Sequence, residues 1–330
     1  MKTGFGIVGT SGHASRVAAP VLKRNPDVSL LGAAGSARER SAQFAQQHGL
    51  PRSYRDLGEM LADRDIDAVW LCSPNHLHAE QVAQCAAAGK HVLVEKPLAT
   101  TKVAAKEAVQ AARRAGITLK VGCQHRFRPA HRQIREWIAS GLVGRLGYFR
   151  IHRFWRYPYF PDMDPAGPPE WRRSGAQSGG WVINDIGSHL LDLMLWISNL
   201  EGTVMGAALA AQHFKLATED STAVLVRLGD TAIGVMETSC ANDSPGSRIE
   251  VYGGSGWIRA DDTLSGAATV TTHEGRTLTF PAVEMLDTYS AEVADFVAAV
   301  QGKPSIGADG AAGAQLVGII EAAVRAGSRG

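Results

Sequence analysis

The chain has 330 residues, of which 45% are hydrophobic and 20% are charged, and its formal net charge is +2. This composition is typical of a globular protein large enough for two domains, and it excludes a disordered chain. A net charge so close to zero predicts no nucleic-acid partner and no attraction to an anionic membrane surface. No apolar run approaches the roughly 20 residues of a membrane-spanning helix, so we expect no membrane segment.

The N-terminal residues and the cysteines indicate where in the cell the protein is expected. The chain enters a strand-like run at once, without a recognisable secretory signal. The cysteines show neither C-x-x-C spacing nor the pattern of a disulfide framework. They are Cys72, Cys85, Cys123 and Cys240. We therefore expect reduced thiols and a cytoplasmic protein.

The first 122 residues alternate short apolar runs with helical patterns. The runs typical of buried strands are residues 4–8, 29–34, 68–72, 91–95 and 118–121. The helical patterns between them are residues 16–24, 38–48, 57–62, 78–88 and 103–115. This alternation predicts an α/β domain, a doubly wound parallel sheet with helices on both faces. Ligands of such sheets bind where the strands end, at their carboxyl edge.

The first strand leads into a glycine-rich turn that opens a helix. Small residues in this context are typical of dinucleotide binding, because they let a pyrophosphate approach the free N–H groups of the helix. The G-x-G-x-x-G spacing is not met, since Ser11 and Ala14 stand in the second and third glycine places. A glycine-rich turn without a ligand is the alternative. The residues of this candidate cofactor site are Gly9, Thr10, Ser11, Gly12, His13 and Ala14.

The end of the second strand bears on the choice between NAD and NADP. A carboxylate at this position would bind the ribose hydroxyls of NAD, but Gly35 stands there instead. Ser36, Arg38 and Arg40 follow, and their side chains suit a 2′-phosphate, which slightly favours NADP. The alternative is that both arginines are solvated residues of a first helical turn.

Polar residues also follow the third and fourth strands. Ser73, Pro74, Asn75 and His78 form a loop that we expect to touch the cofactor. A metal site is less favoured, because no third ligand accompanies the histidines of this loop, and we predict none. After the fourth strand, Glu95 and Lys96 stand at the carboxyl edge of the sheet. A lysine in such a place indicates a functional group, with a strand-end salt bridge as the alternative.

A helix from Asp185 carries polar residues on an otherwise apolar surface. Asp185, His189 and Asp192 are spaced i, i+4 and i+7, which places them on one stripe. Burying such groups is costly unless each is paired or faces a site. We interpret Asp185 and His189 as an acid/base pair and Asp192 as structural. A purely structural hydrogen-bond stripe with an N-capping aspartate is the alternative.

A proline-rich segment over residues 155–173 carries aromatic rings and arginines. Aromatic faces stack on sugar rings, so we expect walls of a substrate site, with a surface or interface loop as the alternative. The aromatic candidates are Trp155, Tyr157, Tyr159 and Trp171. Arginines in this segment, together with Arg126 and Arg153 before it, would favour a carboxylated or phosphorylated sugar, unless they are surface charges. The arginine candidates are Arg126, Arg153, Arg156, Arg172 and Arg173.

The second half has the pattern of an open antiparallel sheet. A helix is predicted up to about residue 140, followed by a long strand over residues 146–156. Shorter strands are predicted at residues 221–228, 231–238, 248–252, 256–260, 268–272 and 278–280, with turn residues between them. Two helices end the chain, near residues 289–301 and 308–326. A broad uncovered sheet face invites another subunit, so we expect a homodimer or homotetramer.

Several of these motifs resemble the glucose–fructose oxidoreductase / inositol dehydrogenase family (Gfo/Idh/MocA oxidoreductases). The most specific is Glu95-Lys96-Pro97. Others are residues 67–78, Arg126-Phe127 followed by Pro129, Gly141…Gly144, Gly179-Gly180…Asp185-x-Gly187-x-His189-x-x-Asp192, and Tyr289-x-x-Glu292-x-x-x-Phe296.

The resemblance implies a Rossmann domain over residues 1–122 and an open, mainly antiparallel α+β domain over residues 123–330. It implies an NAD(P)-linked oxidation or reduction on a sugar, polyol or related cyclic hydroxy compound. The implied catalytic residues are Lys96, Asp185 and His189, with a cis Lys96–Pro97 peptide. Glu95, Lys96 and Gln124 join the expected cofactor site. The expected substrate residues are Lys96, Arg126, Trp155, Trp171, Arg172, Asp185 and His189.

Two other functions fit the same residues. Transient oxidation could enable elimination or glycoside cleavage, so that the nicotinamide is not consumed. A non-catalytic nucleotide-binding scaffold is the other alternative, although a pure binder does not need Lys96, Asp185 and His189 together.

Overall fold

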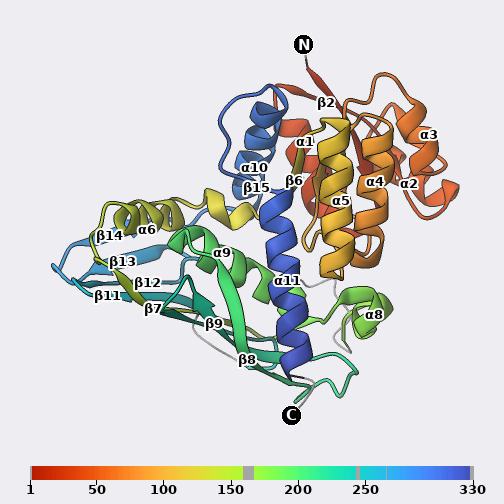
Figure 1. The fold of residues 1–330 in the computed structure, drawn as a ribbon. Coiled ribbons are helices and arrows are strands. Elements are labelled where there is room, and N and C mark those ends of the chain that lie inside the picture. Colours follow the sequence, from red (N-terminus) through yellow and green to blue (C-terminus); the bar gives the residue numbers. More distant parts are fainter. Residues whose placement is uncertain (1, 159–166, 243–245, 265, 328–330) are drawn as a thin grey trace. The chain divides into compact units, whose positions relative to one another are not determined.

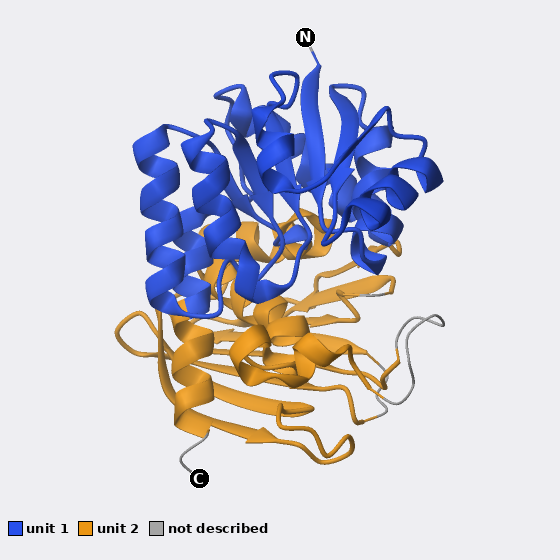
Figure 2. Ribbon diagram, turned by 90° about the vertical axis from the view of Figure 1, so that its right-hand side faces the viewer, with its two compact units in different colours: residues 1–124, 284–317 blue, residues 125–283, 318–330 orange. Residues whose placement is uncertain are grey.

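The computed structural model describes residues 2–158, 167–242, 246–264 and 266–327. The chain divides into two compact units, which Figure 2 distinguishes by colour. Unit 1 comprises Met1–Gln124 and Glu284–Val317, and unit 2 comprises His125–Val283 and Gly318–Gly330. The boundary expected after residue 122 lies close to the first crossing. The expected division did not include the return of residues 284–317 to the first unit.

Unit 1 is built on a seven-stranded sheet with the order β15-β6-β5-β4-β1-β2-β3. Apart from β15, which is antiparallel to β6, neighbouring strands are parallel. The six parallel strands β1 to β6 thus follow the Rossmann order. Strands β1 and β4 are adjacent at the point where the order reverses. The strands are β1 (Thr3–Val8), β2 (Val28–Ala34), β3 (Arg52–Tyr54), β4 (Ala68–Leu71), β5 (His91–Val94), β6 (Leu119–Val121) and β15 (Ala308–Asp309).

Helices cover both faces of this sheet. Side chains of β1 alternate between faces: Phe5 packs edge-on against Phe296 of α10, with ring centroids 5.6 Å apart, whereas Gly6 faces Met60 of α3. Figure 1 shows α4 and α5 side by side on the unit. The helices are η1 (Ala14–Ala18), α1 (Ala19–Arg24), α2 (Arg38–Gln47), α3 (Leu57–Ala62), η2 (Asn75–Leu77), α4 (His78–Ala87), α5 (Lys102–Ala115) and α10 (Met285–Val300).

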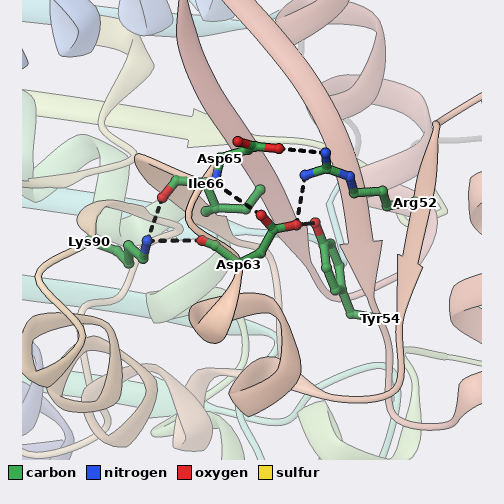
Figure 3. Close-up of polar contacts among 6 residues, drawn as sticks. All are labelled: Arg52, Tyr54, Asp63, Asp65, Ile66 and Lys90. Atoms are coloured by element: carbon green, nitrogen blue, oxygen red, sulfur yellow. Dashed lines mark hydrogen bonds and ion pairs between the residues drawn. The ribbon is translucent and has the colours of Figure 1, made fainter.

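The edge strand β3 was not predicted, because three residues carry too little pattern to signal a strand. Polar contacts hold it, as Figure 3 shows. Arg52 donates to Asp63 at 2.7 Å and to Asp65 at 2.5 Å, and the Tyr54 hydroxyl donates to Asp63 at 2.6 Å. Lys90 donates to the carbonyl oxygens of residues 63 and 66. The network fastens β3 to the segment that precedes β4.

Unit 2 contains an eight-stranded sheet with the order β14-β13-β12-β11-β7-β10-β9-β8. The expected antiparallel pairing holds except between β7 and β10, which are parallel. Strand β8 was not predicted, since its sequence is rich in glycine and alanine and alternates weakly. The strands are β7 (Leu146–Phe154), β8 (Gly202–Ala210), β9 (Ser221–Leu228), β10 (Ala232–Ser239), β11 (Ser247–Gly253), β12 (Trp257–Asp261), β13 (Ala268–Thr272) and β14 (Thr277–Phe280).

One face of this sheet is covered by helices. The backbone of Gly234 in β10 lies against Met194 of α9, and Gly187 lies against Met236, so the helical segment packs tightly on β10. The helices of unit 2 are η3 (Gln124–Phe127), which begins at the boundary, α6 (Pro129–Ala139), α7 (Glu170–Arg173), α8 (Gly175–Ser178), η4 (Ile183–Gly187) and α9 (Ser188–Ser198). The terminal helix α11 (Gly310–Gly327) belongs partly to each unit. Among the described residues, no helix is both long and apolar enough to cross a membrane.

Candidate active site

The turn after β1 fits a dinucleotide. Gly9 has φ +97°, and a Cβ there would lie 2.6 Å from the Cys72 carbonyl oxygen, so only glycine fits. Gly12 lies under the guanidinium of Arg16, a residue that the sequence prediction did not include. An arginine one turn into this helix is suited to the charge of a pyrophosphate.

The helix that follows begins with a π-helical turn, η1. Pro20 lacks the N–H that would bond the carbonyl of Arg16, so the regular ladder is interrupted there. The Ala19 N–H instead bonds the Ala14 carbonyl, five residues back. Turns of this kind are rare and are found mostly at functional sites.

Gly35, which follows β2, lies in close contact with the glycine-rich turn. A Cβ on Gly35 would lie 2.9 Å from the Thr10 hydroxyl, and the Gly35 N–H donates to Ser41 Oγ at 2.8 Å. A carboxylate at residue 35 would therefore displace Thr10 of the glycine-rich turn. Ser36 and Arg38 lie beyond it and are exposed.

The loop after β4 is tied to the peptide that follows Lys96. His78 is fully buried, and its two ring nitrogens lie 2.7 Å from the Pro97 carbonyl oxygen and 2.8 Å from that of Ser73. Burial lowers the pKa of His78, although both carbonyls act in the opposite direction. These contacts join the loop after β4 to the peptide after Lys96. The Lys96–Pro97 peptide is cis, as the resemblance implied.

Glu95 is the centre of a buried polar cluster in unit 1. Its carboxylate accepts from Trp70 Nε1 at 3.1 Å and lies 3.0 Å from His13 Nε2. The ring of His13 also packs edge-on against Tyr289 of α10 at 5.5 Å. Glu95 therefore fixes His13 at the start of the dinucleotide helix.

Gln124 belongs to the same region. Its Nε2 donates to the Tyr289 hydroxyl at 2.8 Å. Its Oε1 is buried and has no hydrogen-bond partner among the residues that the structure describes. A buried acceptor of this kind costs free energy unless a ligand donates to it, so it fits a site for a cofactor amide.

In unit 2, Asp185 lies within the π-helical turn η4 and is paired. Arg172 Nη1 donates to its carboxylate at 3.0 Å, and the guanidinium of Arg172 lies 5.1 Å from the Trp171 ring. Asp185 is therefore not an N-cap. The Ser188 hydroxyl donates to the Asn184 carbonyl at 2.8 Å, which competes with the main-chain ladder of the turn.

His189 is buried in the first turn of α9, against a second histidine. The ring of His125 meets it edge to face, with centroids 4.7 Å apart and planes at 90°. His125 Nδ1 accepts from Arg128 Nε at 3.2 Å, and its carbonyl lies 2.7 Å from His131 Nδ1. Burial, together with these basic neighbours, holds the pKa of His125 well below its usual range.

Comparison with known proteins gives the family. A model of an oxidoreductase family with an NAD-binding Rossmann fold matches residues 3–123, and a Gfo/Idh/MocA C-terminal domain model matches residues 131–259. The chain belongs to the Gfo/Idh/MocA oxidoreductases. The predictions of this family, of its two-domain fold and of an NAD-linked oxidoreductase are confirmed.

Individual relatives support the same assignment. The chain is similar to a 1,5-anhydro-D-fructose reductase of Ensifer adhaerens, with 30% identity covering 89% of this chain and 87% of the relative. It is also similar to a myo-inositol 2-dehydrogenase of Thermotoga maritima, with 28% identity covering 91% and 89%. Among solved structures, GenD2 from gentamicin A biosynthesis in complex with NAD has a TM-score of 0.83 and 26% identity, covering 99% of this chain and 94% of its own.

Two expected substrate residues of this Gfo/Idh/MocA oxidoreductase lie in other surroundings. Arg126 is buried and pairs with Asp192, through Nε to Oδ2 at 2.9 Å and Nη2 to Oδ1 at 2.5 Å. Trp155 is buried in an aromatic cluster with Trp181 and Tyr157. The structural interpretation of Asp192 agrees with its ion pair. Tyr159 lies outside the described residues.

A buried carboxylate missed by sequence reasoning holds the start of η4, the turn that leads into α9. Glu219 accepts from the Ile183 N–H at 2.8 Å. Burial raises the pKa of Glu219, and backbone N–H groups of residues 181–183 oppose that rise. Because Glu219 lies 36 residues from Ile183, no local sequence pattern could predict this contact. Within the described parts of the chain, no cluster of three or more metal-ligating side chains occurs.

Proposed function

We propose that this chain catalyses the NAD(P)-linked interconversion of a carbinol and a ketone on a neutral sugar, polyol or related cyclic hydroxy compound. The observation that carries the proposal is the pair of polar groups on η4 and α9: Asp185 is tied to Arg172, and His189 lies against a neutral imidazole. The names of the two relatives, a reductase of an anhydro sugar and an inositol dehydrogenase, support this substrate class.

Three residues have distinct proposed roles. In the oxidative direction, His189 removes the hydroxyl proton as general base. Lys96 donates a hydrogen bond to the same oxygen and stabilises its developing negative charge. Asp185, held by Arg172, orients a neighbouring hydroxyl group. When bound, the nicotinamide cofactor accepts or donates the hydride.

Two of the five candidate arginines have carboxylate partners, which favours a neutral substrate. Arg172 is neutralised by Asp185 and Arg126 by Asp192, while Arg173 donates to the carbonyl oxygen of Pro168. An arginine that already has a carboxylate partner offers little to a substrate anion. This argues against the carboxylated or phosphorylated sugars that the arginines alone would favour.

The proposed cofactor site comprises the turn after β1 and the loops after β2, β4 and β5. We favour NADP, because exposed Ser36 and Arg38 follow the end of β2, where a carboxylate at residue 35 would displace Thr10. The direct contacts proposed are residues 9–14, Ser36, Arg38, residues 73–75, Lys96 and Gln124. Glu95 and His78 hold contact residues in place, through His13 and Ser73 respectively.

We also propose a homodimer or homotetramer formed through the open face of the unit 2 sheet. A cross-strand row of side chains runs over it, in register from Ile233 through Tyr148 and Tyr252 to Trp257. Three of the four are exposed, Tyr148 being partly buried. The four cysteines are buried free thiols, which supports a location in the reducing cytoplasm.

The test is a panel of substrates assayed with NAD and NADP separately. The panel contains 1,5-anhydro-D-fructose, myo-inositol and related neutral polyols, together with sugar acids and sugar phosphates. We expect turnover of a neutral compound, and Lys96→Ala and His189→Ala to lower kcat by roughly 10²- to 10⁴-fold. Near-normal kcat in both folded variants would refute the roles.

The same assay separates the two alternative functions. Turnover without net change in the absorbance of reduced nicotinamide would indicate transient oxidation during an elimination or a glycoside cleavage. Cofactor binding without turnover of any compound in the panel would favour a non-catalytic scaffold.

A further inference from the structure

Three histidines from three helical segments of unit 2 form a continuous array. His189 lies in the first turn of α9, His125 lies in η3 and His131 lies in α6. The His125 ring lies 4.7 Å from that of His189 and 6.3 Å from that of His131. His131 is fully buried, and His189 is 5% exposed. No sequence motif joins the three, because 64 residues separate His125 from His189.

Hydrogen bonds fix the protonation of His125. Arg128 Nε always carries a hydrogen, so its contact with His125 Nδ1 makes that nitrogen an acceptor. The ring proton of His125 is therefore on Nε2, and the ring is neutral. His131 is fixed in the same manner, since a carbonyl oxygen only accepts and His131 Nδ1 must donate to it.

The charges around the array disfavour the addition of a second proton to the His125 ring. The groups acting most strongly on His125 are His189 of α9, Arg128 beside α6, His131 of α6 and Arg153 of β7, all of them basic. Burial also lowers the pKa of His131, to about 4. An imidazolium at His125, which is partly buried, would face these cationic neighbours, and they favour the neutral ring.

We propose that His125 is a positioning residue for His189: a neutral imidazole whose edge-to-face contact fixes the orientation of the His189 ring and excludes water from it. The inference rests on the proposed function of His189 as general base. The contact keeps the His189 ring in the orientation that a general base requires.

The test compares His125→Ala with His125→Phe, because phenylalanine keeps a ring edge and excludes water. We expect His125→Ala to lower kcat by about tenfold, as part of the general-base contribution is lost. The acid limb of its kcat/KM profile should move to higher pH by about one unit, since water then solvates the imidazolium. His125→Phe should retain the position of the limb. His152→Ala is the matched control, because this β7 imidazole stacks on Phe154 and has no role in the proposed site.

A second readout does not depend on turnover. The ring C–H resonance of His189, assigned by its loss in His189→Asn, is titrated by NMR in the wild-type protein and both His125 variants. A shift of its midpoint to higher pH in His125→Ala alone would support the proposal even if the substrate class is wrong. Identical midpoints in all three proteins, in samples with unchanged thermal unfolding, would overturn it. Failure of the proposed function would instead appear as an unreactive wild-type enzyme.

Discussion

At the scale of residues, most charged groups of the candidate site are already paired within the protein. Asp185 has Arg172, Glu95 has His13 and Trp70, and His189 has a neutral ring beside it. Pairing holds each group in one orientation before a ligand arrives, which is how electrostatic preorganisation lowers a barrier. The exposed arginines after β2 differ from these groups because they are available to a ligand.

Arg38 provides the test of cofactor choice. We expect Arg38→Ala to raise the KM for NADP by roughly 10- to 100-fold, as one charge-assisted hydrogen bond to the 2′-phosphate is lost. The KM for NAD should stay the same, because NAD lacks that phosphate. Initial-rate kinetics with both cofactors measure the two constants. Arg64→Ala, another exposed arginine of unit 1, is the control. Equal changes with both cofactors would contradict a phosphate contact.

At the scale of elements, each unit has a π-helical turn among its candidate site residues. One opens the helix after the glycine-rich turn, and the other carries Asp185 into α9. Each has a local cause, namely Pro20 in the first and the Ser188 hydroxyl in the second. The second turn is also held from outside by Glu219. Such over-determination keeps an uncommon backbone in place.

The Arg126–Asp192 pair joins α9 to η3, and its removal should be costly. Asp192→Asn leaves a buried guanidinium without its charge partner, so we expect a loss of about 3–5 kcal/mol in the free energy of unfolding. Urea unfolding measures it. Removing both charges in Arg126→Met/Asp192→Leu should cost less than the single change, because no unpaired charge remains.

An exposed ion pair of the same unit is the control for this experiment. Arg325 and Glu321 lie 3.6 Å apart on α11 and are largely solvated. Arg325→Ala should therefore change the free energy of unfolding by less than about 1 kcal/mol. Equal costs for Asp192→Asn and Arg325→Ala would show that the buried pair does not hold α9.

At the scale of the whole molecule, the proposed oligomer depends on the open sheet face of unit 2. Leu225, Ile233, Tyr252 and Trp257 are each between 37% and 44% exposed, although they lie in regular strands. The ion pair between Arg150 and Glu237, at 2.8 Å, borders the apolar row. Apolar centres with polar borders are typical of subunit interfaces.

Ile233→Lys should weaken this proposed interface. A lysine at this end of the row would bury a charge on assembly, so we expect a lower oligomeric mass in light scattering at the same protein concentration. The control is Val103→Lys, which changes an exposed apolar residue of unit 1. An unchanged mass in Ile233→Lys, at concentrations near the dissociation midpoint of the wild-type protein, would exclude this face as the interface.

The sequence by itself determined the strands and helices of the Rossmann sheet, the glycine-rich turn, and the polar stripe at Asp185, His189 and Asp192. These features are local, since strand and helix periodicity depends on neighbours within a few residues. Lys96 and its cis peptide came from a short motif. Short elements such as β3 and β15 were not predicted, because two or three residues carry no periodicity.

Only the tertiary structure decided which polar groups meet. The pairs Arg126–Asp192, His125–His189, His78–Pro97 and Glu219–Ile183 join segments 19 to 66 residues apart, and no spacing rule relates their members. The same holds for the return of residues 284–317 to unit 1, where Tyr289 and Phe296 complete its core. The ion pair of Arg126 and the aromatic cluster around Trp155 are likewise visible only in the folded chain. Periodicity shows which side chains share a face, whereas the partner across that face depends on how distant segments pack.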